Sequence, residues 1–364
     1  MRVIKIFQDR IRPVVFLTAI LCTRLAMGQE PAEAPRLSDP GSFTWILLPD
    51  LQNYQKFERN QPILQLMINW IKDQRENLNI QMVFCTGDLT DRGNIIAYDD
   101  LGKGDQSTFQ QWKALSAAFD KLNGLLPVIM CTGNHDYGVK IAENRYSQFN
   151  SYFPPQGNPK TFALLQEMAV NGQGVKTLEN ACYEWISPLQ QKFMIFSLEF
   201  APRTEVLEWA RKVAAQPRYR DHMGVLLTHS YLDTTGLRIS ANNYLLEDMN
   251  SGETLWQKVI KPSGNFRFVL CGHICHSEAP SGHIGYAADK DTLNNTVHQM
   301  LFNAQRVGGG HWGNGGDGWL RILEFLPDKK TVKVYTFSPL LYISPSTRSL
   351  SWRRQAVDEF IMEY

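Results

Sequence analysis

In the first part of the chain, short apolar runs alternate with stretches in which apolar residues recur at helical spacing. The apolar runs cover residues 43–48, 80–85 and 127–131. Between them, residues 63–71 and 109–122 place an apolar side chain every three or four positions, which predicts two amphipathic helices. The order strand, helix, strand, helix, strand is typical of βαβ units and predicts a largely parallel sheet.

The rest of the chain is richer in strand-like segments. The strand candidates there are 183–186, 192–198, 225–228, 266–271, 297–302, 319–325 and 331–337. Residues 204–215 predict a helix, and Pro327-Asp328 favours a hairpin between the last two strands. This pattern predicts an α/β protein built as a four-layer α-β-β-α sandwich, with two mixed β-sheets flanked by helices.

Two segments depart from this regular pattern. Residues 150–180 contain Pro154-Pro155 and several glycines, and we interpret them as an insertion or long loop with some helix. They would interrupt a domain that spans residues 41–340. Residues 341–364 are expected to form an extension that packs back on this domain, with residues 360–362 buried as a short strand.

The first 28 residues have the pattern of a cleaved signal peptide. Basic residues precede an apolar stretch at 14–22, and Ala26-Met27-Gly28 supplies small residues for cleavage. A membrane anchor is the alternative, but about nine apolar residues are too few to span a bilayer. We therefore expect a secreted or periplasmic protein without a transmembrane anchor, in which residues 29–40 form a flexible lead-in.

The charge of the exported chain argues against one class of partner. The whole chain has 37 Lys and Arg against 36 Asp and Glu, and residues 1–28 hold five basic residues and one acid. The remainder therefore has 32 against 35, a net charge of −3. Such a balance provides no basis for general nucleic-acid binding. Five cysteines remain after residue 28, so at least one is unpaired, and no disulfide is identified.

Five of the predicted strands end in loops that carry metal-binding residue types. These loops are Asp50-Leu51-Gln52, Gly87-Asp88-Leu89-Thr90-Asp91-Arg92, Gly133-Asn134-His135-Asp136, Thr228-His229 and Gly272-His273-Ile274-Cys275-His276. In α/β folds, ligands bind beyond the carboxyl ends of the strands, so the five loops can converge on one site. Carboxylate, amide and imidazole ligands together suit Mn²⁺, Fe or Zn²⁺.

In this order the loops resemble the pattern of the calcineurin-like metallophosphoesterase superfamily, which is D-x-H, G-D-x-x-D-R, G-N-H-D, a lone His and G-H-x-H. Four of the five blocks match outright, and the first departs from the pattern at Gln52. The match reaches from Asp50 to His276. The resemblance implies the metallo-dependent phosphatase fold, phosphoesterase activity and a cofactor of two divalent metal ions.

The resemblance also implies which residues hold the metals. Asp88 would bridge both ions. The other ligands would be Asp50, Gln52 and His276 at the first metal, and Asn134, His229 and His273 at the second. Such a pair would hold a bridging hydroxide as nucleophile and neutralise the phosphoryl oxygens.

Further residues are expected to act on the substrate. His135 would face the leaving-group oxygen as a general acid or electrostatic stabiliser, and Asp136 would orient its imidazole. Arg92 is a candidate phosphate clamp, because a guanidinium can bind two oxygens at once, and a structural ion pair is the alternative. Asn134 is a candidate substrate contact as well as a ligand.

Gln52 stands where the family usually has histidine. Its carbonyl oxygen is a harder and weaker ligand than imidazole, so the first metal is expected to bind less tightly, or to be Mn²⁺ or Fe rather than Zn²⁺. The alternative is that Gln52 reaches the metal through water. Asp91 occupies the position where purple acid phosphatases have a metal-binding tyrosine, which argues against a tyrosinate–iron centre.

A glycine-rich loop follows Asn303 and Gln305. Seven of the eleven residues in 308–318 are glycine. The loop predicts a substrate-contacting rim beside the metals, in which His311 or Asn314 donates hydrogen bonds, or else a mobile hairpin connection.

We therefore expect metal-dependent hydrolysis of a small phosphorylated substrate, with a phosphomonoester favoured. One alternative is a phosphodiesterase acting on cyclic nucleotides or lipid head groups, and another is a nuclease, which the charge disfavours. A third is an inactive, metal-stabilised binding protein, for which Gln52 is the sole support. The sequence gives no indication of the oligomeric state.

Overall fold

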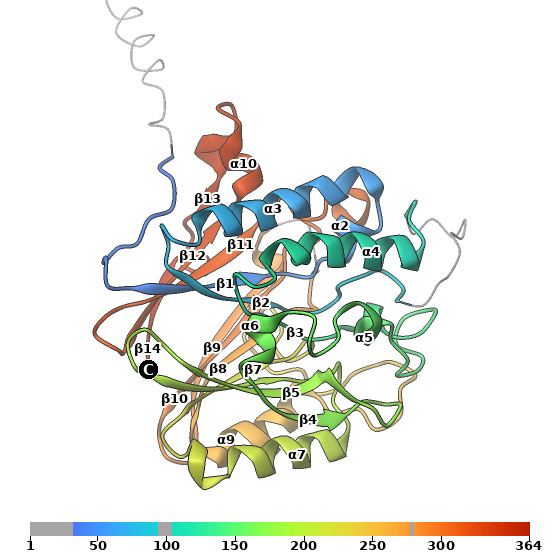
Figure 1. Cartoon of the computed structure of the whole chain (residues 1–364), viewed down its shortest axis with the longest axis vertical. Helices are drawn as coiled ribbons and strands as arrows, with labels where there is room; N and C mark the ends of the chain where they lie inside the picture. The colour runs from blue at the N-terminus through green and yellow to red at the C-terminus, as the bar shows by residue number, and fades with distance from the viewer. Residues whose placement is uncertain (1–31, 94–103, 277–279) are drawn as a thin grey trace, which may run out of the picture.

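A computed structural model describes residues 32–93, 104–276 and 280–364 (Figure 1). The predicted signal peptide, residues 1–28, and the first residues of the lead-in lie outside the described part of the chain. Within that part, no helix combines the length and the apolar character needed to cross a membrane.

Two mixed β-sheets face each other across the core. The first, in the order β13-β12-β11-β1-β2-β3 with β14 beside β12, contains β1 (Phe43–Leu48), β2 (Ile80–Cys85), β3 (Val128–Met130), β11 (Leu320–Phe325), β12 (Thr331–Phe337), β13 (Trp352–Arg353) and β14 (Phe360–Glu363). The second, in the order β4-β5-β6-β7-β8-β10-β9, contains β4 (Leu165–Val170), β5 (Lys176–Ile186), β6 (Lys192–Ser197), β7 (Met223–Leu227), β8 (Phe266–Cys271), β9 (Ile284–Lys290) and β10 (Thr296–Phe302). Strands β1, β2 and β3 are parallel to one another, as are β6, β7, β8 and β10, and the outer strands are antiparallel.

Helices cover the outer face of each sheet (Figure 1). Over the first sheet lie α3 (Gln61–Gln74) and α4 (Thr108–Phe119), and over the second lie α7 (Thr204–Ala214) and α9 (Lys261–Ser263). The shorter helices are α2 (Gln52–Gln55), α5 (Phe149–Tyr152), α6 (Pro159–Phe162), α8 (Gly252–Leu255) and α10 (Pro339–Ile343). This arrangement confirms the predicted four-layer α-β-β-α sandwich.

Aromatic side chains join the two sheets. The ring of Trp45 on β1 lies 4.4 Å from that of Phe325 and 5.0 Å from that of Phe193 on β6 in the facing sheet. Burial of a side chain of this size stabilises a fold by about 2–3 kcal/mol, and ring pairs of this kind add roughly 0.5–1.5 kcal/mol. These ring contacts therefore hold the two sheets together near the amino-terminal ends of β1 and β6.

Residues 150–180 contain more regular structure than their pattern predicts. They form α6, the edge strand β4 and the first part of β5, which pairs antiparallel with β4. The side chains of β4 are mostly half-buried, so the strand has no clear alternation of apolar and polar positions. At the other end of the chain, β13 and β14 return to pair with β12, with Met362 buried and Ile361 exposed.

Candidate metal centre

The site lies where parallel strands from both sheets end. Loops after β1, β2 and β3 supply Asp50, Asp88 and Asn134, and loops after β7 and β8 supply His229 and His273. Parallel strands place their carboxyl ends at one edge of a sheet, and the two sheets face each other, so residues far apart in sequence meet.

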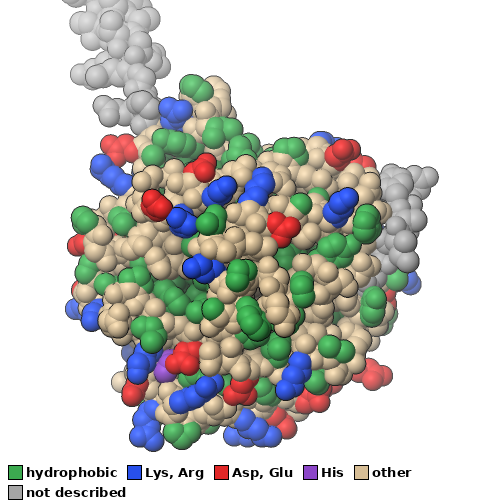
Figure 2. All heavy atoms as spheres, viewed as in Figure 1, with side chains coloured by type: hydrophobic (Ala, Val, Ile, Leu, Met, Phe, Trp, Pro, Cys, Tyr) green, Lys and Arg blue, Asp and Glu red, His purple; other side chains and the backbone are tan. Residues whose placement is uncertain are grey.

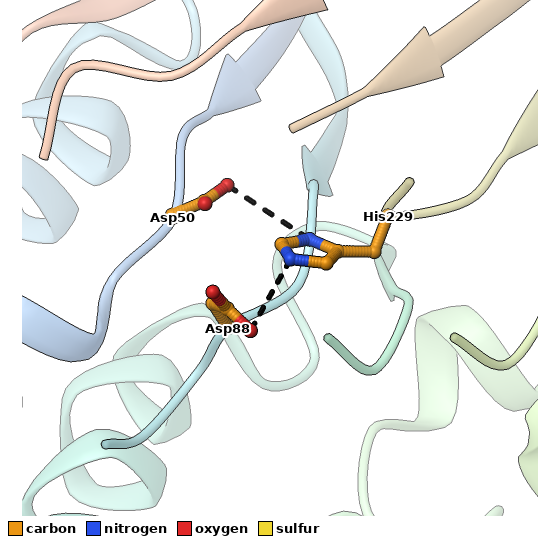
Figure 3. A group of neighbouring side chains, drawn as sticks. All are labelled: Asp50, Asp88 and His229. Carbon is orange, nitrogen blue, oxygen red and sulfur yellow. Dashed lines mark ion pairs between the residues drawn. The ribbon is translucent and has the colours of Figure 1, made fainter. Parts of the chain in front are cut away.

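Asp50, Asp88 and His229 form the centre of the site (Figure 3). All three are buried, and each offers a ligand atom within 4.8 Å of the other two. His229 Nε2 lies 3.2 Å from Asp88 Oδ1, and His229 Nδ1 lies 4.0 Å from Asp50 Oδ1. Two carboxylates and an imidazole that converge in a buried space fit a divalent cation.

The hydrogen bonds of His229 orient its ring for metal binding. Nδ1 lies 2.6 Å from the carbonyl oxygen of Thr86, which can only accept, so Nδ1 carries the proton of this bond. Burial would lower the pKa of His229, but the charges of Asp88 and Asp50 raise it to about 9, so Nε2 directs a proton toward Asp88 and toward Asn134 Oδ1, 3.1 Å away. A metal ion bound at Nε2 would take the place of this proton. A carbonyl that holds the far nitrogen of a ligating histidine is a common feature of metal sites.

Gln52 has the oxygen that a metal ligand needs. Its Nε2 donates to Asp88 Oδ2 at 2.9 Å, whereas its Oε1 is buried and has no hydrogen-bond partner among the residues that the structure describes. A buried carbonyl oxygen without a donor carries a free-energy cost that a cation would remove. The residues present therefore fit a metal on this side of Asp88.

Asp50 is held by neutral donors. Its Oδ2 accepts hydrogen bonds from Asn303 Nδ2 at 2.7 Å and Gln305 Nε2 at 3.1 Å, and its Oδ1 accepts from Thr86 Oγ1 at 3.1 Å. These donors fix the carboxylate without cancelling its charge. Asn303 and Gln305, which follow β10, thus orient a candidate ligand. In the sequence these two residues precede the glycine-rich loop that was expected to form the substrate rim.

The ionisation of the cluster reflects its burial. Burial and the negative charge of Asp88 raise the pKa of Asp50 to about 7. Burial would also raise the pKa of Asp88, but the charges of His229 and His135 outweigh it and hold that pKa below its usual range. Burial and the charge of His229 lower the pKa of His273 to about 3, so its ring is neutral, as a ligand must be.

Two glycines let the loops approach the carboxylates. A Cβ on Gly133 would lie 2.1 Å from Asp88 Oδ1, and a Cβ on Gly272 would lie 2.1 Å from Asp50 Oδ1. Either side chain would displace a candidate ligand, so these positions require glycine for space rather than for turn geometry.

The partner of His135 differs from the sequence prediction. Its Nδ1 lies 2.6 Å from Asp91 Oδ1, and its backbone N–H donates to Asp88 Oδ1 at 2.9 Å. Asp136 was expected to orient this ring, and that assignment is wrong. The Asp136 carboxylate is fully buried and accepts from the backbone N–H groups of Gly133, Leu89 and Thr90, so it holds the two loops together.

The pKa of His135 follows from these neighbours. Burial would lower it, but the negative charge of Asp88 and the hydrogen bond and charge of Asp91 raise it to about 9. The side chain is 22% exposed, and only its Nδ1 is engaged by Asp91.

The other predicted residues lie farther from the centre. His276 is exposed, and its backbone N–H donates to Gly282, so its role as a metal ligand stays a prediction. Arg92 is half-buried beside Asp91, whose pKa its charge helps to lower, and its role as a phosphate clamp also stays a prediction.

The side chain of half-buried Asn314 bonds within its own loop, and its role as a substrate contact stays a prediction. Its Oδ1 accepts from the backbone N–H groups of Gly316 and Asp317 and thereby fixes the glycine-rich loop. His311 is exposed on the same loop, and its pKa is lowered by burial and by Lys56, Arg306 and His135. The loop thus reaches the His135 side of the centre, with His311 rather than Asn314 on its surface.

Lys56 is a cation near the site that the sequence motifs did not reveal. It is buried at the end of α2, and its positive charge acts on both His135 and Asp91. A lysine within an otherwise apolar and amide-rich stretch, four residues after Gln52, is the signal that could have identified it.

A buried cluster of carboxylate, amide and imidazole groups at the strand ends of this sandwich is the arrangement of a metal-dependent protein. Residues 45–277, more than half of the chain, match the model of the calcineurin-like phosphoesterase family. The chain therefore belongs to this family, and the family implies a site for two divalent metal ions, which the Asp50, Asp88 and His229 cluster fits.

Two individual proteins are similar to this chain, one in sequence and the other in fold. The chain is 29% identical over 310 residues to the uncharacterized protein YvnB of Bacillus subtilis (strain 168), which covers 84% of this chain and 20% of that protein. The chain thus spans a fifth of the length of this relative. A dimetal phosphatase from Danio rerio has the same fold, with a TM-score of 0.51 and 11% identity over 90% of this chain and 100% of that one.

Proposed function

We propose that the protein is a phosphomonoesterase whose chemistry is centred on Asp88. The observation that carries the proposal is the position of this carboxylate, which contacts Gln52 Nε2, the His135 N–H and His229 Nε2. Asp88 therefore connects the candidate ligands of both sheets with the candidate acid. In this proposal it is shared by both metals.

The remaining ligands divide between the two sides of Asp88. Asp50 and Gln52 serve the first metal, with His276 as a further candidate. Asn134, His229 and His273 serve the second. When bound, the metals supply the positive charge that activates water and neutralises the phosphoryl oxygens.

His135 supplies the proton for the leaving group. Asp91 holds Nδ1, which directs Nε2 away from the protein and toward the substrate. Because the pKa of His135 is raised to about 9, Nε2 carries a proton at neutral pH and can give it to the leaving oxygen. Asp91 also holds the positive charge of the imidazolium before the transfer.

The charges around this acid favour a monoester. Lys56, Arg92 and His135 all act on Asp91 and bring positive charge to the leaving-group side. A phosphomonoester carries two negative charges at neutral pH, whereas a diester carries one, so the cationic side favours the monoester. Basic and acidic side chains are interspersed over the face that Figure 2 shows, which supports a small substrate over a nucleic acid.

A paired substrate test separates monoester from diester hydrolysis. We expect higher kcat/KM for 4-nitrophenyl phosphate than for bis(4-nitrophenyl) phosphate in protein loaded with Mn²⁺, Fe²⁺ or Zn²⁺ in turn. Chelation should abolish both rates, and Mn²⁺ or Fe²⁺ should restore them better than Zn²⁺ because Gln52 offers an oxygen ligand. A consistent preference for the diester would instead favour the phosphodiesterase alternative.

We further propose that the protein is exported by cleavage after residue 28. The basic and apolar pattern of residues 1–28 supports this proposal. Separately, the five cysteines of the described residues are free, so the fold does not depend on a disulfide. Amino-terminal sequencing of the expressed protein should begin at Gln29. A retained first residue would contradict export by this route.

A further inference from the structure

An exposed aromatic ring lies on the glycine-rich loop, which begins shortly after Gln305, a donor to Asp50 Oδ2. The side chain of Trp312 is 59% exposed, and its ring centroid lies 5.8 Å from that of buried Phe57. Arg59 stacks on Phe57, with its Cζ 4.2 Å from the ring centroid, and donates from Nη2 to the Trp312 carbonyl at 2.7 Å. We call Phe57 and Trp312, with Lys56 and Arg59, the Trp312 shelf.

The loop that carries Trp312 is fixed on both sides of the ring. Asn60 Nδ2 donates to the Gly313 carbonyl at 2.8 Å, and the Gly318 N–H donates to the hydroxyl of buried Tyr54 at 3.0 Å. Single exposed apolar residues are normal on a protein surface. A large ring on a backbone that several hydrogen bonds hold in place is different, because the loop loses little conformational entropy when a ligand stacks on the ring.

The shelf lies on the leaving-group side of the site. Lys56 Nζ is 5.9 Å from the Trp312 ring centroid and 5.4 Å from that of Phe57. The same amine is close enough to His135 and Asp91 to influence the ionisation of both. His311, next to Trp312 in sequence, is likewise under the influence of His135 and Asp91. Direct contacts also join the loop of Trp312 to the centre, because Gln305 Nε2 donates to Asp50 Oδ2 at 3.1 Å and Asn53 Nδ2 donates to the Gln305 carbonyl at 2.9 Å.

We propose that the Trp312 shelf binds a planar aromatic ring carried by the leaving group, so that the enzyme prefers aromatic phosphate esters to alkyl ones. This inference rests on the proposed function, because it uses His135 to identify the leaving-group side. The ring stacks on the open face of Trp312, while Lys56 and Arg59 keep the aromatic pair in place. Stacking on an aromatic side chain is expected to change affinity by between about 5-fold and 100-fold.

Binding of two non-hydrolysable phosphonates tests the shelf without using turnover. We expect Mn²⁺-loaded protein to bind benzylphosphonate more tightly than n-butylphosphonate, by about 5-fold or more in calorimetry. Trp312→Ala should make the two affinities equal by weakening the benzyl compound alone, and Trp312→Phe should retain most of the preference. Leu293→Ala, which removes a 71% exposed side chain on the turn between β9 and β10, should leave both affinities unchanged.

Two outcomes would overturn the inference while leaving the proposed function intact. One is equal affinity of the wild-type protein for both phosphonates, and the other is an unchanged benzyl preference in Trp312→Ala. Loss of binding of both phosphonates together with absence of metal-dependent hydrolysis would overturn the proposed function, and the inference with it. A kinetic comparison of 1-naphthyl phosphate with glycerol 2-phosphate should give the same order of preference.

Discussion

Replacement of Asp88 by asparagine is expected to lower kcat/KM by at least about 10³-fold, because a shared metal ligand contributes several kcal/mol to catalysis. The substitution removes the charge that lies between Gln52 and His229 but changes the shape of the side chain little. Asp88 has a φ of 46°, a left-handed conformation that asparagine tolerates well, so the backbone should be retained. The loss should therefore come from the metals rather than from unfolding.

Metal content and folding should be measured on the same Asp88→Asn preparation. Elemental analysis should show fewer bound ions than in the wild type, while circular dichroism should show an unchanged fold. Asp120→Asn, which alters an exposed carboxylate at the end of α4, is the matched control and should keep full metal content and activity. An Asp88→Asn protein with normal metal content and normal turnover would refute the role of Asp88.

Replacement of His135 by alanine is expected to lower kcat by about 10²- to 10⁴-fold while metal content stays unchanged. The imidazole contacts Asp91 through Nδ1 and its side chain is partly exposed, which suits an acid that reaches a substrate. Asp91→Asn should give a smaller loss, because the ring remains but its orientation and charge are less well supported.

The pH profile distinguishes a proton donor from a structural histidine. If His135 donates a proton, activity should fall as the pH rises through its raised pKa, and the Asp91→Asn protein should lose activity at a lower pH, since Asp91 helps to raise that pKa. His222→Ala provides a comparison, since this histidine bonds Glu184 on β5 and lies in another part of the fold. Normal kcat in His135→Ala would remove the residue from the mechanism.

The fold and most of the candidate centre could be predicted from sequence because strand ends carry the ligands. Each apolar run ends at a polar loop, and parallel strands bring those loops to one edge, so Asp50, Asp88 and His229 could be expected to meet. The edge strand β4 could not be predicted in the same way. Its half-buried side chains mix apolar and polar types without a period of two.

The partner of His135 could not be read from sequence because it depends on local turn geometry. Asp91 and Asp136 are both carboxylates in neighbouring loops, and either could have faced the ring. Residues Asn134–Asp136 form a short 3-10 turn, which directs Asp136 back onto the amides of Gly133, Leu89 and Thr90. Buried backbone N–H groups need hydrogen-bond acceptors, and the Asp136 carboxylate supplies them here. Asp91 is then the carboxylate that binds the ring of His135.

The proximity of Trp312 and Lys56 also could not be predicted from the sequence. They are separated by more than two hundred residues, and neither belongs to a recognised motif. Their proximity arises because the loop after α2 and the glycine-rich loop before β11 pack against each other, with Arg59 and Asn60 bonded to Trp312 and Gly313. Such contacts between loops depend on tertiary packing and leave no periodic signal in either segment.

A crystal structure of Mn²⁺-loaded protein, with the ions located by anomalous scattering, tests the central claim most directly. The account predicts two peaks, both within bonding distance of Asp88, one adjoining Asp50 and Gln52 and the other adjoining Asn134 and His229. A single ion, or two ions of which either lies away from Asp88, would contradict it.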